Sequence, residues 1–449
     1  MLQFTPPPSK GILVRFILFA ASLFIIPGIH AQRMLTLEEA IATALQNNYD
    51  IQLSKNDSAV AALDYSYRNA VFIPRLNGNL GTTWNNNAQK QTLADGSKRE
   101  SKGIKSHNIA AGLALNWTLF DGLKMFAARD KAEEFIRLGE LTIKNQVVNT
   151  VAAVITNYYS IVRQKQQLKA IEEQMSINNE RVKLAQYKLD IGTGAKPDLL
   201  QSKVDLNAQK AAQLNQQTLI AQLKEQLNQS MNVAGDISYE VLDTIILNTQ
   251  LSLVDIQNGM EKTNPLLLIA GKNIDIARFT LKERKAERYP TVSFNSAYNF
   301  SRTDNKTVIN PFSPLFNQAK GFNYGFTATI PILNNFNTKR LIKQAQTDIQ
   351  FRELVYQNQR SQINLSVLNA FKDYEAQKQA LKLEEENILL AKENVSIIFE
   401  TYRLGAATYI QLREAQNSLE AAYNRLIAAR YNTKLAETEL LRLKGELIK

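Results

Sequence analysis

Alternate residues of the segment His107–Gly122 are apolar without a break. The apolar set is Ile109, Ala111, Leu113, Leu115, Trp117 and Leu119, and the residues between them are small or polar. Alternation with a period of two predicts a β-strand with one apolar and one polar face. The length is close to the roughly 9–11 tilted residues of a transmembrane strand. For this segment alone, a half-buried strand of a soluble sheet stays open as the alternative.

Three further segments show the same alternation. They lie at about 75–85, 291–301 and 322–333, while the first strand occupies about 107–119. The stretches between paired strands, 85–105 and 301–321, are polar and predict long loops. The sequence therefore predicts two β-hairpins, each with a long polar loop.

Long helical patterns follow each hairpin. After the first hairpin, one pattern runs over about 123–189, turns at Gly192 and returns over about 197–232. At ~1.5 Å per residue the first run is on the order of 100 Å long if it is continuous. That length predicts a coiled-coil-like element rather than part of a compact domain. A shorter helical segment precedes the hairpin, and Thr36 with Glu39 forms a capping-box pattern at its start.

The chain then repeats this plan. Pro290 follows Pro74 by 216 residues, and Asn264 lies where Asn48 lies in the first copy. The strand exit LFDG matches ILNN, and the turn at Gly192 matches Gly405, both at a shift of 213. We therefore predict a tandem duplication of one structural unit. The predicted divisions are a first repeat at 32–233 with a helical hairpin at 121–232, a linker at 234–252, and a second repeat at 253–449 with a helical hairpin at 336–444.

Residues 1–31 have the three parts of a secretory signal peptide. Lys10 and Arg15 precede an apolar run at 16–26, and small residues up to Ala31 provide a cleavage site. After this segment no run of eighteen apolar residues occurs, so we expect no helical membrane span in the mature chain. We therefore expect an exported protein.

Composition excludes several classes of function. The formal charge is +11, but basic residues are dispersed among acidic ones without an aromatic-interleaved cluster, so we expect no nucleic-acid binding. The chain has no cysteine, and His107 is the only histidine after the signal segment. No nucleophile or cofactor-binding motif stands out. We therefore predict no enzymatic activity, no cofactor and no metal site, and transport energy would come from a partner.

The number of strands constrains the assembly. Four strands are too few to close a membrane barrel, whose minimum is about eight. An open edge would leave backbone groups without hydrogen-bond partners in lipid. If the strands cross a membrane, several chains must share one barrel, with their helices gathered on one side as a common cylinder.

The ordered set of these motifs resembles the TolC family of outer-membrane efflux proteins. The resemblance covers about Leu35 to Leu443 and includes the paired turns YKLDIGTGAKPDLLQS and YRLGAATYIQLREAQ. It implies a mainly α fold with membrane β-structure. Each chain would give four strands to a twelve-stranded barrel in a homotrimer, with a coiled-coil tunnel in the periplasm. It also implies an exit duct of a tripartite efflux or type I secretion system, with a periplasmic adaptor, an inner-membrane pump and outer-membrane lipid as partners.

The resemblance also assigns a periplasmic gate to the two helix turns. An acidic position of the family corresponds to Asp198, and a tyrosine corresponds to Tyr402. Two acidic positions of the constriction correspond to Gln411 and Glu414, and an arginine that locks the closed gate corresponds to Ala407. The sequence therefore departs from the family at Gln411 and Ala407. Identical acids around a three-fold axis sum their potential and attract cations.

Each of these residues has a structural alternative. Asp198 near the start of a helix is favoured by the helix dipole, Glu414 is explained as a solvated residue, and Tyr402 as packing under its turn. Gly192 and Gly405 are explained first as turn residues. The expected adaptor contacts are Lys188, Leu189, Gly192, Arg403, Leu404 and Gly405. The expected aromatic belt is Trp84, Trp117, Phe300, Phe322 and Tyr324.

Two other classes compete with the export duct. An exported coiled-coil adhesin or periplasmic scaffold would explain the long helices, but it does not need strands with an apolar outer face. A secreted enzyme would need a catalytic set that the sequence lacks. The strand pattern therefore favours an outer-membrane duct.

Overall fold

The computed structural model describes residues 33–235, 239–248, 250–310 and 312–447. The expected signal peptide at 1–31 lies outside these residues. The chain forms two compact units, and each takes segments from both halves of the sequence. Among the described residues, the first unit contains 33–43, those of Val154–Ile245, and Glu393–Ile427, and the second unit contains the rest.

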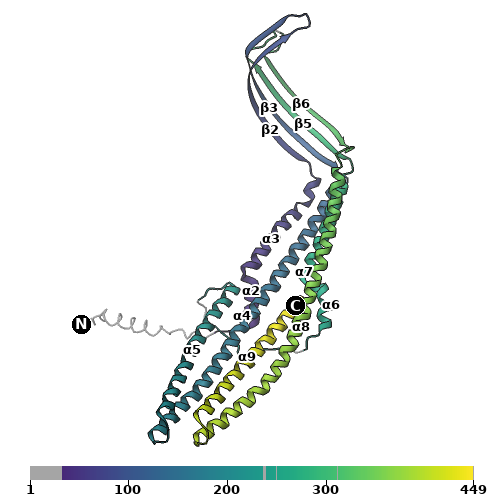
Figure 1. Cartoon of the computed structure of the whole chain (residues 1–449). Helices are drawn as coiled ribbons and strands as arrows, with labels where there is room; N and C mark the ends of the chain where they lie inside the picture. The colour runs from purple at the N-terminus through teal and green to yellow at the C-terminus, as the bar shows by residue number, and fades with distance from the viewer. Residues whose placement is uncertain (1–32, 236–238, 249, 311, 448–449) are drawn as a thin grey trace, which may run out of the picture. The chain divides into compact units, whose positions relative to one another are not determined.

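The second unit holds a four-stranded antiparallel sheet (Figure 1). Its strands are β2 (Arg75–Thr92), β3 (Lys98–Phe120), β5 (Thr291–Asn305) and β6 (Phe316–Thr329). They are ordered β2-β3-β5-β6, so the two predicted hairpins meet through β3 and β5. Within this sheet β2 and β6 are the edge strands.

The register places the predicted apolar positions on one face of the sheet. Directly opposite residues of antiparallel strands share a face, and one row across the sheet is Gly78, Leu113, Tyr298 and Phe322. A second row on this face joins Trp117, Phe294 and Phe326, and the rings of Phe294 and Phe326 are 5.2 Å apart. The alternation in the sequence is therefore a real division of the sheet into two faces.

The opposite face carries small and polar side chains, and several bond across the strands. Asn108 Nδ2 donates to Thr303 Oγ1 at 2.9 Å, and Asn295 Nδ2 donates to Thr327 Oγ1 at 3.1 Å. Because these bonds link side chains at the expected alternate positions, they confirm the polar face independently of the apolar pattern.

The expected strand ends were wrong in five places, because β2 and β5 end later, β3 and β6 begin earlier, and β6 ends earlier than expected. Most of the expected loop at 85–105 is strand, and only 93–97 separates β2 from β3. Likewise β6 begins at Phe316 and not near 322. These extensions are mostly polar, with Ile104 and Phe316 as isolated large apolar residues, so they lack the alternation that marks a half-apolar strand. At the other end β6 stops at Thr329 and not near 333, because Pro331 cannot donate a ladder hydrogen bond.

The helices that precede each hairpin in the sequence confirm the repeated caps. The first half has α2 (Leu37–Asn47), α3 (Tyr49–Ser66) and a short 3-10 turn, η2 (Arg68–Phe72); the second has α6 (Leu253–Thr263) and α7 (Pro265–Ala286). Asn48 caps α3 and Asn264 caps α7, each accepting from the second and third following N–H groups. Both arms of the capping box at the start of α2 are present, since Glu39 N donates to Thr36 Oγ1 at 3.1 Å and Thr36 N to Glu39 Oε2 at 3.5 Å.

Four long helices connect these elements. They are α4 (Lys124–Asp190), α5 (Lys196–Met231), α8 (Asn337–Arg403) and α9 (Tyr409–Lys444). Both α4 and α8 have 67 residues, so each is ~100 Å long. Among the described helices, none combines the length and the apolar character needed to cross a membrane.

The first unit also contains a small parallel pair, β1 (Arg33–Leu35) with β4 (Tyr239–Val241). Tyr158 of α4 fixes this pair, because its hydroxyl donates to Leu35 O at 3.0 Å and accepts from Leu242 N at 3.2 Å. The expected linker at 234–252 therefore includes a strand that pairs with the beginning of the described chain.

Candidate functional site

In the first unit, the turns that join α4 to α5 and α8 to α9 lie side by side (Figure 1). Gly192 has φ +77° and Gly405 has φ +83°, a region that favours glycine. The Gly192 N–H donates to Leu189 O in the last turn of α4, and the Gly405 N–H donates to Tyr402 O in the last turn of α8. The structural explanation for both glycines is therefore sufficient.

Lys188 and Tyr402 link the two turns directly. Lys188 Nζ donates to Tyr402 O at 2.6 Å and lies 4.1 Å from the centre of the Tyr402 ring. Tyr402 is 5% exposed and packs with Tyr409 and Leu412. Burial, with a contribution from the Asp198 carboxylate, raises the pKa of Tyr402.

Gln411 completes a capping box at the start of α9. Its Oε1 accepts from Thr408 N at 2.8 Å, and Gln411 N donates to Thr408 Oγ1 at 3.3 Å. This is the reciprocal arrangement in which glutamine and glutamate are interchangeable. Glu414 is exposed on the next turn, and Asp198 lies in the first turn of α5. Gln411 therefore has a structural reason of its own at this position.

A buried ionic cluster near these turns links the two helical hairpins, α4–α5 and α8–α9. Arg181 of α4 is 1% exposed, and its Nη2 lies 2.5 Å from Asp205 Oδ2 of α5. Its Nη1 donates to Gln416 Oε1 of α9 at 2.6 Å. The Tyr409 hydroxyl, also on α9, donates to Asp205 Oδ2 at 2.8 Å. One arginine therefore joins three helices.

The charges of this cluster are matched. Burial raises the pKa of the Asp205 carboxyl, but hydrogen bonds from Gln201 and Tyr409 and the charge of Arg181 outweigh it, so the pKa is lowered. Burial and the bond to Asp205 raise the pKa of Tyr409 to about 12. Near neutral pH the cluster is therefore an arginine cation, an aspartate anion and a neutral tyrosine.

Some donors around Arg181 are left over. Within the described residues, the buried atoms Arg181 Nε, Gln174 Nε2 and Gln416 Nε2 have no hydrogen-bond partner. All three residues line a polar pocket of about 260 Å³ between α4, α5 and α9. A polar pocket of this size has room for water, which can satisfy such donors.

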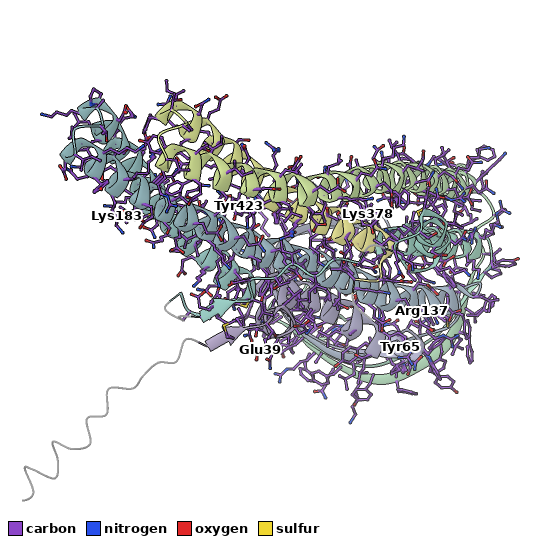
Figure 2. The ribbon with its side chains drawn as sticks, turned by 90° about the horizontal axis from the view of Figure 1, so that it is seen from below. Glu39, Tyr65, Arg137, Lys183, Lys378 and Tyr423 are labelled. Atoms are coloured by element: carbon purple, nitrogen blue, oxygen red, sulfur yellow. The ribbon has the colours of Figure 1, made fainter. Side chains whose placement is uncertain are left out.

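Sequence reasoning missed this cluster. Gln174, Asn178 and Arg181 are buried polar residues spaced four and three apart on α4. That spacing is the only sequence signal of the cluster. It cannot be told apart from the row of polar residues on a solvent-exposed helix face. A second link, from the Tyr423 hydroxyl of α9 to Glu173 of α4, lies farther along the same helices (Figure 2 labels Tyr423).

The expected adaptor-contact residues differ in exposure. Leu404 is 78% exposed, while Leu189 and Lys188 are half-buried. Arg403 pairs with Glu400 at 2.7 Å on the same helix. Leu404 is therefore the large apolar side chain that the second turn presents.

All five expected belt residues lie on the apolar face of the sheet. Trp84 lies opposite His107, and the two rings stack at 4.8 Å. Trp117 lies ten residues from His107 along β3, and its indole Nε1 donates to Phe72 O at 2.8 Å. Phe300, Phe322 and Tyr324 occupy rows between these two levels.

The described residues contain no group of three or more histidine, aspartate or glutamate side chains that could hold a metal ion. The site consists of hydrogen bonds and ion pairs between helices. Such an arrangement can hold two hairpins together or release them.

The chain combines a sheet that has one apolar and one polar face and open edges with two helices of 67 residues each. This combination defines the class of outer-membrane ducts in which each chain contributes a few strands to one barrel. The sequence profile described as "Outer membrane efflux protein" matches residues 40–233 and 259–446, once in each predicted repeat. The chain belongs to this outer membrane efflux protein family.

Relatives and solved structures agree with this assignment. The outer membrane efflux protein BepC of Brucella suis is 20% identical over 413 residues, which cover 92% of this chain and 86% of BepC. The outer membrane protein TolC of Escherichia coli is 19% identical, over 78% of this chain and 72% of TolC. A crystal structure of CusC superposes with a TM-score of 0.75 at 17% identity, covering 91% of this chain and 92% of CusC.

The fold is therefore the TolC fold, and the chain is an outer-membrane exit duct with a helical tunnel in the periplasm. The expected fold class, location and general function are confirmed. The competing interpretation as a coiled-coil adhesin or scaffold is set aside.

Proposed function

We propose that three copies of this chain assemble into one duct, in which twelve strands close a barrel and the long helices form the tunnel. The observation that supports this is the open sheet with β2 and β6 as its edges. In lipid each edge would leave backbone groups unpaired, at several kcal/mol per group. Pairing β2 of one copy with β6 of the next removes every edge.

We further propose that the duct joins a periplasmic adaptor and an inner-membrane pump, because no nucleotide-binding or catalytic motif that could supply energy stands out in the sequence. The two turns form the periplasmic entrance, and the adaptor contacts Lys188, Leu189, Gly192, Arg403, Leu404 and Gly405. The exposure of Leu404 supports this placement, since an exposed apolar side chain at a turn suits a protein contact.

The gate in this proposal comprises Asp198, Tyr402, Gln411 and Glu414 at the entrance, held by Arg181 below it. Arg181 supplies the fixed positive charge that the family's gate-locking arginine, replaced here by Ala407, would otherwise provide. The contacts of Arg181 support this role, since it bonds to Asp205 of α5 and Gln416 of α9 and so joins the two helical hairpins.

The experiment that tests the duct measures the native mass and location of the exported protein. We expect a complex of three chains in detergent-solubilised outer membranes. Recovery of a soluble monomer from the periplasm would contradict the proposal.

The gate is tested separately in planar lipid bilayers. Removing a carboxylate from the entrance lowers the local cation concentration, so Glu414→Ala should reduce the preference for cations. Glu393→Ala, which removes an exposed carboxylate elsewhere on α8, is the matched control. Equal effects of the two variants would return Glu414 to the role of a solvated residue.

A further inference from the structure

In four aligned stretches of the sheet, the polar face carries a single formal charge on each chain. Over Arg75–Asn85, Ser106–Thr118, Ser293–Thr303 and Asn317–Thr327, each residue of this face is Asn, Ser, Thr, Gly or Ala, except Arg75. Other ionic side chains of the sheet, such as Arg302 and Lys320, have the register of the apolar face. Within these four stretches, Arg75 is therefore the only charged residue on the polar side of the sheet.

Arg75 also lies at a defined level. It is the first residue of β2 after Pro74, and its row across the sheet is Asn116, Asn295 and Gly325. The corresponding position of the second repeat is Thr291, so the chain supplies one arginine and not two. Arg75 is exposed, and within the described residues it makes no ion pair.

We propose that Arg75 forms a ring of three positive charges where the barrel meets the tunnel, and that this ring favours anionic solutes and cargo in the membrane segment of the duct. This inference rests on the proposed trimer. It assigns to the barrel a preference opposite to that of the acidic residues at the periplasmic entrance.

The dimensions make such a ring effective. Twelve strands about 4.8 Å apart and tilted by roughly 40° give a backbone radius of about 12 Å. An arginine side chain reaches roughly half of that distance inward. The Debye length is ~10 Å at 0.1 M salt and ~30 Å at 0.01 M, so the axis lies within reach of all three charges. Coulomb's law with this screening gives about fivefold enrichment of a monovalent anion at 0.1 M, and more at lower salt.

The absence of cysteine from the chain provides a local probe. A single Asn116→Cys places a thiol opposite Arg75, and its reaction rates with an anionic and a cationic methanethiosulfonate reagent report the local potential. The outer side of the barrel admits the reagents, so the state of the periplasmic gate does not enter the measurement. Asn295→Cys, in the same row, serves if Asn116→Cys does not fold.

The ratio of the anionic to the cationic rate should fall at least fivefold when Arg75→Ala is added, and it should invert with Arg75→Glu. Arg75→Lys should keep most of the excess of the anionic over the cationic rate. At Asn108→Cys, eight residues along β3, the same changes should have little effect at 0.1 M salt. Lys320→Ala, which removes a charge from the other face, should leave the Asn116→Cys ratio unchanged.

Two failures have different meanings. A thiol at Asn116→Cys and at Asn295→Cys that neither reagent reaches in folded protein would overturn the lumen itself, and with it the proposed trimeric duct. A reactive thiol whose rate ratio does not respond to Arg75→Ala would overturn only the role of Arg75.

Discussion

Removing Asp205 should destabilise the helical hairpins more than removing its partner Arg181. In Asp205→Ala the buried Arg181 cation, 1% exposed, loses its counter-charge, which costs about 3–5 kcal/mol. In Arg181→Met the Asp205 side chain is still 22% exposed and keeps its bonds from Gln201 and Tyr409. We expect that variant to lose only about 1–2 kcal/mol.

The double variant Arg181→Met with Asp205→Leu gives the sharper test. Apolar replacement of both partners of a buried ion pair is often neutral or stabilising. We therefore expect it to be more stable than Asp205→Ala alone, although it removes more of the native interaction.

Thermal unfolding of the detergent-solubilised protein, followed by circular dichroism, measures these differences. For a unit of 150–250 residues about 1 kcal/mol shifts Tm by 2–4 °C, so Asp205→Ala should lower Tm by roughly 6–20 °C. The reasoning is refuted if Arg181→Met is as damaging as Asp205→Ala, or if the losses of the two single variants simply add in the double variant.

Three further predictions concern the turns. Thr408→Ala should cost about 1 kcal/mol of stability by removing the cap of α9. Gln411→Glu should keep the capping box and raise the preference for cations in bilayers. A loss of stability with Gln411→Glu would contradict the capping role. Gly405→Ala should cost about 1–2 kcal/mol because of its φ of +83°, while Gly271→Ala, in open space inside α7, should be neutral or stabilising by denaturant unfolding. Folding raises the pKa of Tyr409 from 10.0 to about 12, so its contribution to the free energy of unfolding is complete below pH 10 and is lost as pH rises to 12. Tyr409→Phe should flatten the dependence of stability on pH in this range. An unchanged dependence would exclude Tyr409 as its source.

The strands could be predicted from sequence only where their two faces differ. His107–Leu119 alternates strictly, so its existence and its faces were predictable. The continuation of β2 through Asn85–Thr92 was not, because both faces there carry polar residues. Backbone hydrogen bonds extend a strand regardless of side-chain polarity, and they leave no trace in the sequence.

The duplication made the caps and turns predictable, because each appears twice at one spacing. The cluster around Arg181 does not follow the duplication. Its partners Asp205 and Gln416 are 24 and 235 residues away. Only the packing of α4 against α9 brings Arg181 and Gln416 together, so no local sequence pattern predicts this contact.

The open edges of the sheet have a consequence for genetics. In the proposed trimer every chain supplies one side of two seams, so a single chain with a proline in the middle of β6 spoils a whole duct. If a cell makes intact and altered chains in equal amounts and they mix freely, roughly one trimer in eight contains only intact chains. Such an allele should therefore be dominant, and a loss of expression should be recessive.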